Sequence, residues 1–110
     1  MPSTPSNNLE TAHVLLMDIV AYSQLTMGEQ SECIHALQDM VRRTAAFQSA
    51  QADGDLIILP TGDGMALVFF RNPLAPVECA LEIARMLQDS DAFPLRMGIH
   101  TGPVLRVEDL

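Results

Sequence analysis

The chain has 110 residues, 48% of them hydrophobic, which is enough for a single folded domain with a core of its own. Fourteen acidic side chains stand against six arginines and no lysine, so the formal net charge is −8. Nucleic-acid binding normally needs a basic stripe, and this charge balance argues against it. An anionic ligand would have to be neutralised by metal ions and backbone amides instead.

The first twelve residues are rich in Pro, Ser and Asn, which predicts a disordered tail over residues 1–12 and a folded domain over residues 13–110. No apolar run reaches the length of a membrane span, and no signal peptide is indicated at the start of the chain. Cys33 and Cys79 fall in predicted helices without metal-type spacing, so we expect reduced thiols. These features predict a cytoplasmic protein with no membrane segment in this chain.

The first predicted strand covers residues 13–17, whose continuous apolar run is typical of a central strand. Asp18 follows it directly. Residues 19–26 then form a short predicted helix with free amides at its start, which Gly28 is expected to end. Apolar positions at helical spacing predict one helix over residues 31–52.

A turn at Asp53-Gly54 leads into two apolar runs, residues 56–59 and 65–70. The runs flank Thr61-Gly62-Asp63-Gly64, which is the pattern of a buried β-hairpin with a tight turn. Asp63 stands between two glycines, so other atoms can approach the backbone closely there. The hairpin therefore predicts a carboxylate held on a short, stiff connection.

Residues 73–88 carry an apolar stripe at helical spacing after an Asn-Pro start, which predicts the second main helix. Residues 93–99 are a predicted strand, and His100-Thr101-Gly102-Pro103 is a predicted turn. His100 is accordingly given a structural role in that turn. Residues 104–107 then begin an additional strand at the C-terminus.

The predicted order is β-α-β-β-α-β, which gives an α+β ferredoxin-like antiparallel sheet with both helices on one face. In that topology the third strand lies antiparallel beside the first. The end of the first strand then meets the hairpin turn, so Asp18 and Asp63 are expected at one edge of the sheet. Because the strands are apolar on both sides, the face without helices predicts a partner chain or further sequence.

Two aspartates beside the start of a helix suit divalent cations that carry a polyphosphate. Backbone amides at Ala21, Tyr22 and Ser23 could hold phosphate oxygens, while two cations could activate a hydroxyl and stabilise a leaving pyrophosphate. The structural alternative is that Asp18 only caps the helix and Asp63 only forms the turn. Residue spacing alone leaves both interpretations open.

Three motifs resemble the class III adenylate/guanylate cyclase catalytic domain, in its bacterial form. They are Asp18-Ile19-Val20-Ala21-Tyr22-Ser23, Thr61-Gly62-Asp63-Gly64, and Arg96-Met97-Gly98-Ile99-His100-Thr101-Gly102-Pro103-Val104. They occur in the family's order and cover residues 13–107. The chain is thus similar to the N-terminal portion of such a domain, with its C-terminal part missing.

The resemblance implies that Asp18, Asp63 and the backbone carbonyl of Ile19 bind two Mg²⁺ or Mn²⁺ ions. It also implies that the amides of residues 21–23 contact the triphosphate, and that no catalytic residue is separate from the metal ligands. The family reaction is attack of the ribose 3′-hydroxyl on the α-phosphate, which gives a cyclic nucleotide and pyrophosphate.

Three departures from the family pattern bear on activity. Ala21 stands where the family usually has glycine. Leu59 stands at a base-selecting position where adenylyl-forming members carry lysine and guanylyl-forming members glutamate, so ATP and GTP both stay open. The family domain continues beyond Leu110 with base- and ribose-binding residues, and its active sites form between two subunits. The resemblance therefore implies a homodimer or a full-length cyclase as partner. A homodimer of this chain would join two metal-binding halves without the complementary half, so the chain by itself is expected to be inactive.

Other functions remain as alternatives. The chain could be a catalytically silent cyclase-like module that pairs with and regulates a complete cyclase. A diguanylate-cyclase-like palm shares the topology, but its turn normally has a second acid, which Thr61-Gly62-Asp63-Gly64-Met65 lacks. A phosphoacceptor receiver would need an acidic pair after the first strand and a later lysine, and the chain has neither.

Overall fold

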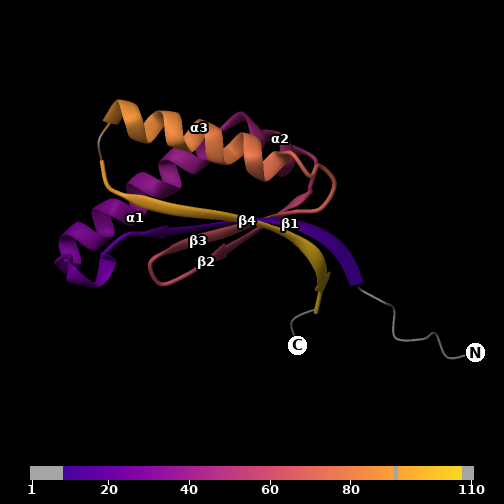
Figure 1. Ribbon diagram of the computed structural model, residues 1–110, viewed down its shortest axis with the longest axis horizontal. Coiled ribbons are helices and arrows are strands. Elements are labelled where there is room, and N and C mark those ends of the chain that lie inside the picture. The colour runs from indigo at the N-terminus through magenta and orange to yellow at the C-terminus, as the bar shows by residue number, and fades with distance from the viewer. Residues whose placement is uncertain (1–8, 91, 108–110) are drawn as a thin grey trace, which may run out of the picture.

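The computed structural model describes residues 9–90 and 92–107, and residues 1–8, 91 and 108–110 lie outside its description. Its four strands form one antiparallel sheet in the order β2-β3-β1-β4, with the three α-helices against one face (Figure 1). The elements are β1 (Leu9–Ile19), a 3₁₀ turn η1 (Tyr22–Gln24), α1 (Met27–Arg43), α2 (Ala45–Ala52), β2 (Leu56–Pro60), β3 (Gly64–Phe69), α3 (Ala75–Ser90) and β4 (Leu95–Leu105).

Strand β1 lies inside the sheet, between β3 and β4, as its continuous apolar run predicted. Its pairing with β3 places Leu15 opposite Leu67 and Met17 opposite Met65. Because side chains alternate along a strand, these residues share the face toward the helices and form the centre of the core. The predicted antiparallel neighbourhood of the first and third strands is confirmed.

Both ends of the β1–β4 pair differ from the prediction. Strand β1 begins at Leu9, and Ala12, which falls in the segment predicted as a disordered tail, is fully buried. Residues 100–103 form no turn: they continue β4, so the predicted additional strand is the end of the same strand. The two 11-residue strands stabilise each other by pairing along their whole length. Pro103 is tolerated because β4 is an edge strand within the described sheet.

The single helix predicted over residues 31–52 is two helices, divided at Thr44. The backbone of Thr44 is extended (φ −72°, ψ 143°), which interrupts the helical hydrogen bonds. Its hydroxyl donates to the Val41 carbonyl (2.8 Å) and accepts from the Phe47 N–H (3.2 Å). One buried threonine thus ends α1 and caps α2.

Helix α1 also begins earlier than predicted. Thr26 and Glu29 form a capping box, in which the Thr26 hydroxyl accepts from the Glu29 N–H and the Glu29 carboxylate from the Thr26 N–H. The Thr26 N–H is the main reason that the pKa of Glu29 is lowered. Gly28 lies inside the first turn of α1 and does not end the preceding segment.

Both cysteines are free thiols, and they differ in burial. Cys79 is fully buried on α3 against Thr44, whose Oγ1 lies 3.5 Å from its Sγ. Burial raises the pKa of the Cys79 thiol to about 11. A thiol with that pKa is almost wholly protonated near neutral pH and therefore a poor nucleophile or metal ligand.

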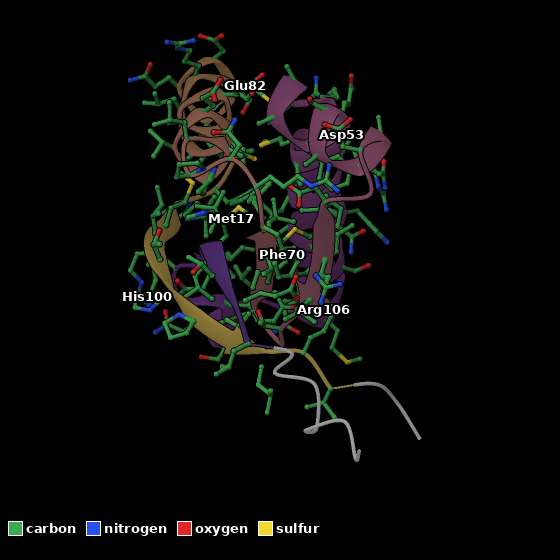
Figure 2. All side chains as sticks on the ribbon, turned by 90° about the vertical axis from the view of Figure 1, so that its right-hand side faces the viewer. Met17, Asp53, Phe70, Glu82, His100 and Arg106 are labelled. Atoms are coloured by element: carbon green, nitrogen blue, oxygen red, sulfur yellow. The ribbon has the colours of Figure 1, made fainter. Side chains whose placement is uncertain are left out.

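The sheet face away from the helices is covered by no element of the described chain (Figures 1 and 2). Leu16 and Leu59 lie on it with 49% of each side chain exposed, next to the partly buried Val14 and Ile57. The described helices thus lie on one face of the sheet, as predicted, and the partner expected for the other face stays a prediction. Among the described residues, no helix is both long enough and apolar enough to cross a membrane.

Candidate metal centre

Asp18 lies near the end of β1, in register with Gly64 of β3 and Arg96 of β4. Residues two apart on a strand share a face, so Asp18 points to the same open side of the sheet as Leu16. Its side chain is 35% exposed. The carboxylate is therefore accessible from the face that the helices leave open.

Asp63 lies in the loop between β2 and β3, which is bound to the end of β1. The Asp63 carbonyl accepts a hydrogen bond from the Ile19 N–H at 2.8 Å, and the Thr61 N–H closes the loop on the Gly64 carbonyl at 3.1 Å. Asp63 is thus held beside the residue that follows Asp18. Both aspartates lie at the same edge of the sheet, as the topology predicted.

Gly64 makes this approach possible. A Cβ built on Gly64 would lie 1.9 Å from the carbonyl oxygen of Met17, in the neighbouring strand. Only a residue without a side chain lets β3 start so close to β1. The glycine after Asp63 is therefore required by backbone contact.

Arg96 of β4 contacts the carboxylate of Asp18 directly, with its Nη2 donating to Oδ2 at 2.8 Å. The pKa of Arg96 is raised by this hydrogen bond first, then by the charge of Asp18, and further by the charge of Asp63. One guanidinium thus experiences both carboxylates. The structural alternative for Asp18 is wrong, because the N-cap residue of η1 is Ala21 and no side chain caps that turn.

The backbone turns sharply after the first aspartate. Ala21 adopts a left-handed conformation (φ 57°, ψ 32°), and the Gln24 N–H donates to its carbonyl at 3.0 Å to close η1. The predicted helix over residues 19–26 is therefore only this 3₁₀ turn. The N–H groups of Tyr22 and Ser23 precede the first donor of the turn, so the turn itself gives them no carbonyl partner.

The conformation of Ala21 explains why glycine suits this position. Replacing it with glycine (Ala21→Gly) is expected to raise the free energy of unfolding by about 1 kcal/mol, because an L-residue is strained in the left-handed region. Urea denaturation followed by circular dichroism would measure the change. Ala36→Gly, inside α1, is the control and is expected to lower stability by about 1 kcal/mol. A loss of stability in Ala21→Gly would contradict the assigned strain.

Leu59 lies on the open face of β2, two strands away from Asp18 of β1. Leu59 pairs with Ala66 of β3, and Ala66 pairs with Leu16 of β1. These three residues form one row across the sheet, and Asp18 lies two residues along β1 from that row. His100 also lies on the side away from the helices, on β4 (Figure 2). It is four residues, about 13 Å, along the strand from Arg96. The open face thus has an apolar surface beside Asp18.

The donor set fits a hard cation that brings further ligands with it. Asp18 and Asp63 could supply carboxylate oxygens, and the backbone carbonyl of Ile19, the residue after Asp18, could supply another. In the described part of the chain, no three His, Cys, Asp or Glu side chains are grouped so as to hold a metal ion. Mg²⁺ is commonly bound in this way, by one or two carboxylates together with substrate phosphates and water.

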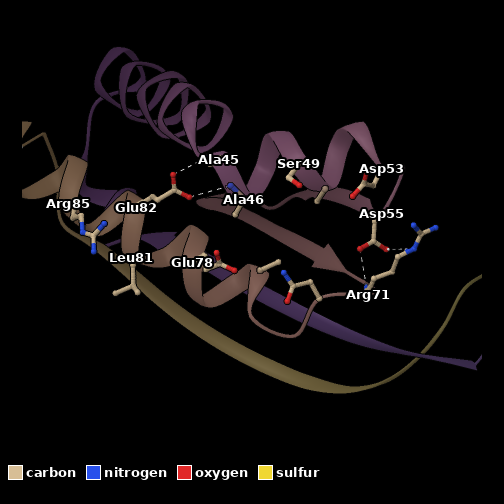
Figure 3. A pocket seen from close by; sticks show the side chains of 13 residues that line it. Ala45, Ala46, Ser49, Asp53, Asp55, Arg71, Glu78, Leu81, Glu82 and Arg85 are labelled. Carbon is tan, nitrogen blue, oxygen red and sulfur yellow. Dashed lines mark hydrogen bonds and ion pairs between the residues drawn. The ribbon is translucent and has the colours of Figure 1, made fainter.

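A cavity of about 590 Å³ lies elsewhere in the described residues, between α2 and α3 (Figure 3). Two of its four carboxylates, Glu82 and Asp55, have structural partners. Glu82 accepts hydrogen bonds from the Ala45 and Ala46 N–H groups at the start of α2 (2.8 and 3.3 Å). Asp55 accepts from the Arg71 N–H at 3.0 Å. These contacts stabilise the helix layer, and the aspartates of the sheet edge do not line this cavity.

Two side-chain contacts between β1 and β4 were missed from sequence, one at the site and one five residues away along β1. Arg96 is part of a recognised motif, but its contact with Asp18 follows only from the register of β1 with β4. His13 received no role, yet it is buried (8% exposed), with its Nδ1 3.0 Å from the hydroxyl of Thr101 on the paired strand. An antiparallel alignment of the two apolar strands would have been the available signal.

Comparisons of this chain with protein-family models, curated proteins and solved structures find no match. Its function is therefore to be judged from its own residues. The residues that bear on it are two aspartates at one edge of the sheet, a tight turn that follows the first, and an apolar face beside Asp18.

Proposed function

We propose that the chain is the metal-binding half of a class III nucleotide cyclase catalytic domain, built on a ferredoxin-like fold. The observation that carries the proposal is the bond from the Ile19 N–H to the Asp63 carbonyl, which holds the hairpin aspartate beside Asp18. The β-α-β-β-α-β order, counting α1 and α2 as one helical segment, and the two inner strands β3 and β1 support the fold assignment.

In this proposal Asp18, Asp63 and the Ile19 carbonyl bind two Mg²⁺ or Mn²⁺ ions, which supply charge neutralisation and lower the pKa of the attacking hydroxyl. The amides of residues 21–23 orient the triphosphate. The ribose 3′-oxygen then forms a bond to the α-phosphorus while the bond to pyrophosphate breaks, giving a 3′,5′-cyclic nucleotide. Leu59 has no polar side-chain atom to distinguish the purines, so ATP and GTP are both candidate substrates.

The rest of the active site comes from a partner in this proposal. The open face carries Leu16 and Leu59 beside Asp18, and a covering chain would bury them while closing the site from water. A full-length cyclase is the proposed partner that supplies the missing half. A homodimer of this chain would join two metal-binding halves, so the chain is proposed to be inactive by itself. Two free thiols suit a reducing cytoplasm as the place of this signalling reaction.

A complementation assay tests this function. The chain is mixed with a homologous class III cyclase whose two metal-binding aspartates have been replaced, and cyclic nucleotide is measured with Mn²⁺ and either ATP or GTP. Restored synthesis is expected, since each partner supplies the half that the other lacks. The chain alone, and the mixture made with Asp63→Ala, are the controls and should give no product.

A second candidate is a silent module that regulates a complete cyclase. Leu59 at the base-selecting position favours it, because a leucine cannot hydrogen-bond a purine edge. Association with the partner without restored synthesis, together with a changed activity of an intact cyclase, would support this candidate over the first.

A further inference from the structure

The carboxylate of Asp18 already has a cationic partner in the structure. Arg96 stands opposite it in the β1–β4 ladder, and Nη2 donates to Oδ2 at 2.8 Å. The guanidinium also lies within the electrostatic influence of Asp63, the other acid of the site. A single positive charge therefore neutralises part of the acid pair.

A guanidinium and a divalent cation compete for the same oxygen. A carboxylate oxygen that accepts a short, charge-assisted hydrogen bond is partly withdrawn from metal coordination, and two cations in contact repel each other. Arg96 is 74% exposed, so its side chain can leave Asp18 for water without any movement of β4. Exposed ion pairs are weak, which makes this one displaceable.

We propose that Arg96 is a built-in competitor of the metal ion, a counter-ion that a divalent cation must displace from Asp18. This inference rests on the proposed function, because it requires that the aspartate pair binds cations. In the metal-free protein Arg96 offsets the repulsion between Asp18 and Asp63. It also raises the concentration of free cation that is needed to fill the site.

The chain contains a matched control for this contact. Arg106 lies near the end of β4 and forms an ion pair of the same kind with Glu10 of β1, with Nε 3.0 Å from Oε2. Replacing either arginine with glutamine removes one positive charge from the same strand region. Both variants therefore attract cations more strongly by a similar amount. Only Arg96→Gln also removes the hydrogen bond to the Asp18 carboxylate.

The test is isothermal titration calorimetry of the full 110-residue chain with Mn²⁺ alone. Four proteins are compared: the unsubstituted chain, Arg96→Gln, Arg106→Gln and Asp63→Ala. Arg96→Gln is expected to bind Mn²⁺ about fivefold more tightly than the unsubstituted chain, and Arg106→Gln within about twofold of it. Titration with Mg²⁺ provides a second measurement by NMR. The Nε–Hε signal of Arg96 should shift as the site fills, while that of Arg106 stays in place.

The outcomes separate this inference from the proposed function. Equal or weaker binding by Arg96→Gln, in a chain whose binding is lost in Asp63→Ala, overturns the competition and leaves the metal site intact. If folded unsubstituted chain and folded Arg96→Gln both fail to bind Mn²⁺, the metal site itself is refuted and the inference with it. Tighter binding confined to Arg96→Gln supports both.

Discussion

Replacing Asp63 with alanine (Asp63→Ala) is expected to abolish Mn²⁺ binding by this chain. The side chain lies on the loop that the Ile19 N–H binds to the end of β1, and its charge reaches the same guanidinium as that of Asp18. Without substrate phosphates, one remaining carboxylate is too small a donor set to hold a hard cation against water. Isothermal titration calorimetry with Mn²⁺ measures the loss, and circular dichroism checks that the fold is retained.

Asp53→Ala is the matched control for this substitution. It removes one negative charge from another exposed turn and leaves the sheet edge unchanged, so Mn²⁺ binding is expected to persist. Asp18→Asn keeps the shape of the side chain but removes its charge, and it should weaken binding at least about tenfold. Binding that survives unchanged in both Asp63→Ala and Asp18→Asn would refute the metal centre.

Replacing Gly64 with alanine (Gly64→Ala) is expected to lower the free energy of unfolding by about 3 kcal/mol. The new methyl group would lie 1.9 Å from the Met17 carbonyl oxygen, which belongs to backbone and cannot rotate away. Strands β1 and β3 would have to move apart beside Met17 and Met65, which belong to the core. Urea denaturation measures the change.

Gly62→Ala is the control within the same loop, because a Cβ there meets no atom within 4 Å. Its effect on stability is expected to stay within about 0.5 kcal/mol. Gly64→Ala should also reduce Mn²⁺ affinity, since Asp63 is the preceding residue and moves with the strand. Equal stability of Gly64→Ala and Gly62→Ala would show that the close contact of β1 and β3 does not hold in solution.

Local patterns predicted the strands of the hairpin correctly, but they placed some ends of strands and helices wrongly. The apolar runs on either side of Thr61-Gly62-Asp63-Gly64 defined the hairpin, because apolar runs and turn chemistry are properties of adjacent residues. The same local logic failed at residues 100–103, where a sequence typical of a turn is extended by pairing with β1. It failed again at Thr44, since helical spacing continues on both sides of the break.

The capping box at Thr26 and Glu29 shows that some of this missing information is present in the sequence. The Thr-x-x-Glu pattern before an apolar stripe is a known helix start, and it would have placed the beginning of α1 correctly. Gly28, two residues after Thr26, instead predicted the end of the preceding segment. Glycine in the first turn of a capped helix costs little, because side chains satisfy the free N–H groups there.

By itself the sequence determined the strand and hairpin pattern, the acidic charge, and the two aspartates that follow or interrupt apolar runs. These are consequences of residue type and short spacing, which act within a few residues of the chain. Only the tertiary structure decided that Arg96 contacts Asp18 across 78 residues of sequence, that Gly64 lies against the backbone of Met17, and that Leu16 and Leu59 share an open face. Strand register makes these choices, because a shift by one residue turns every side chain of a strand to the other face of the sheet.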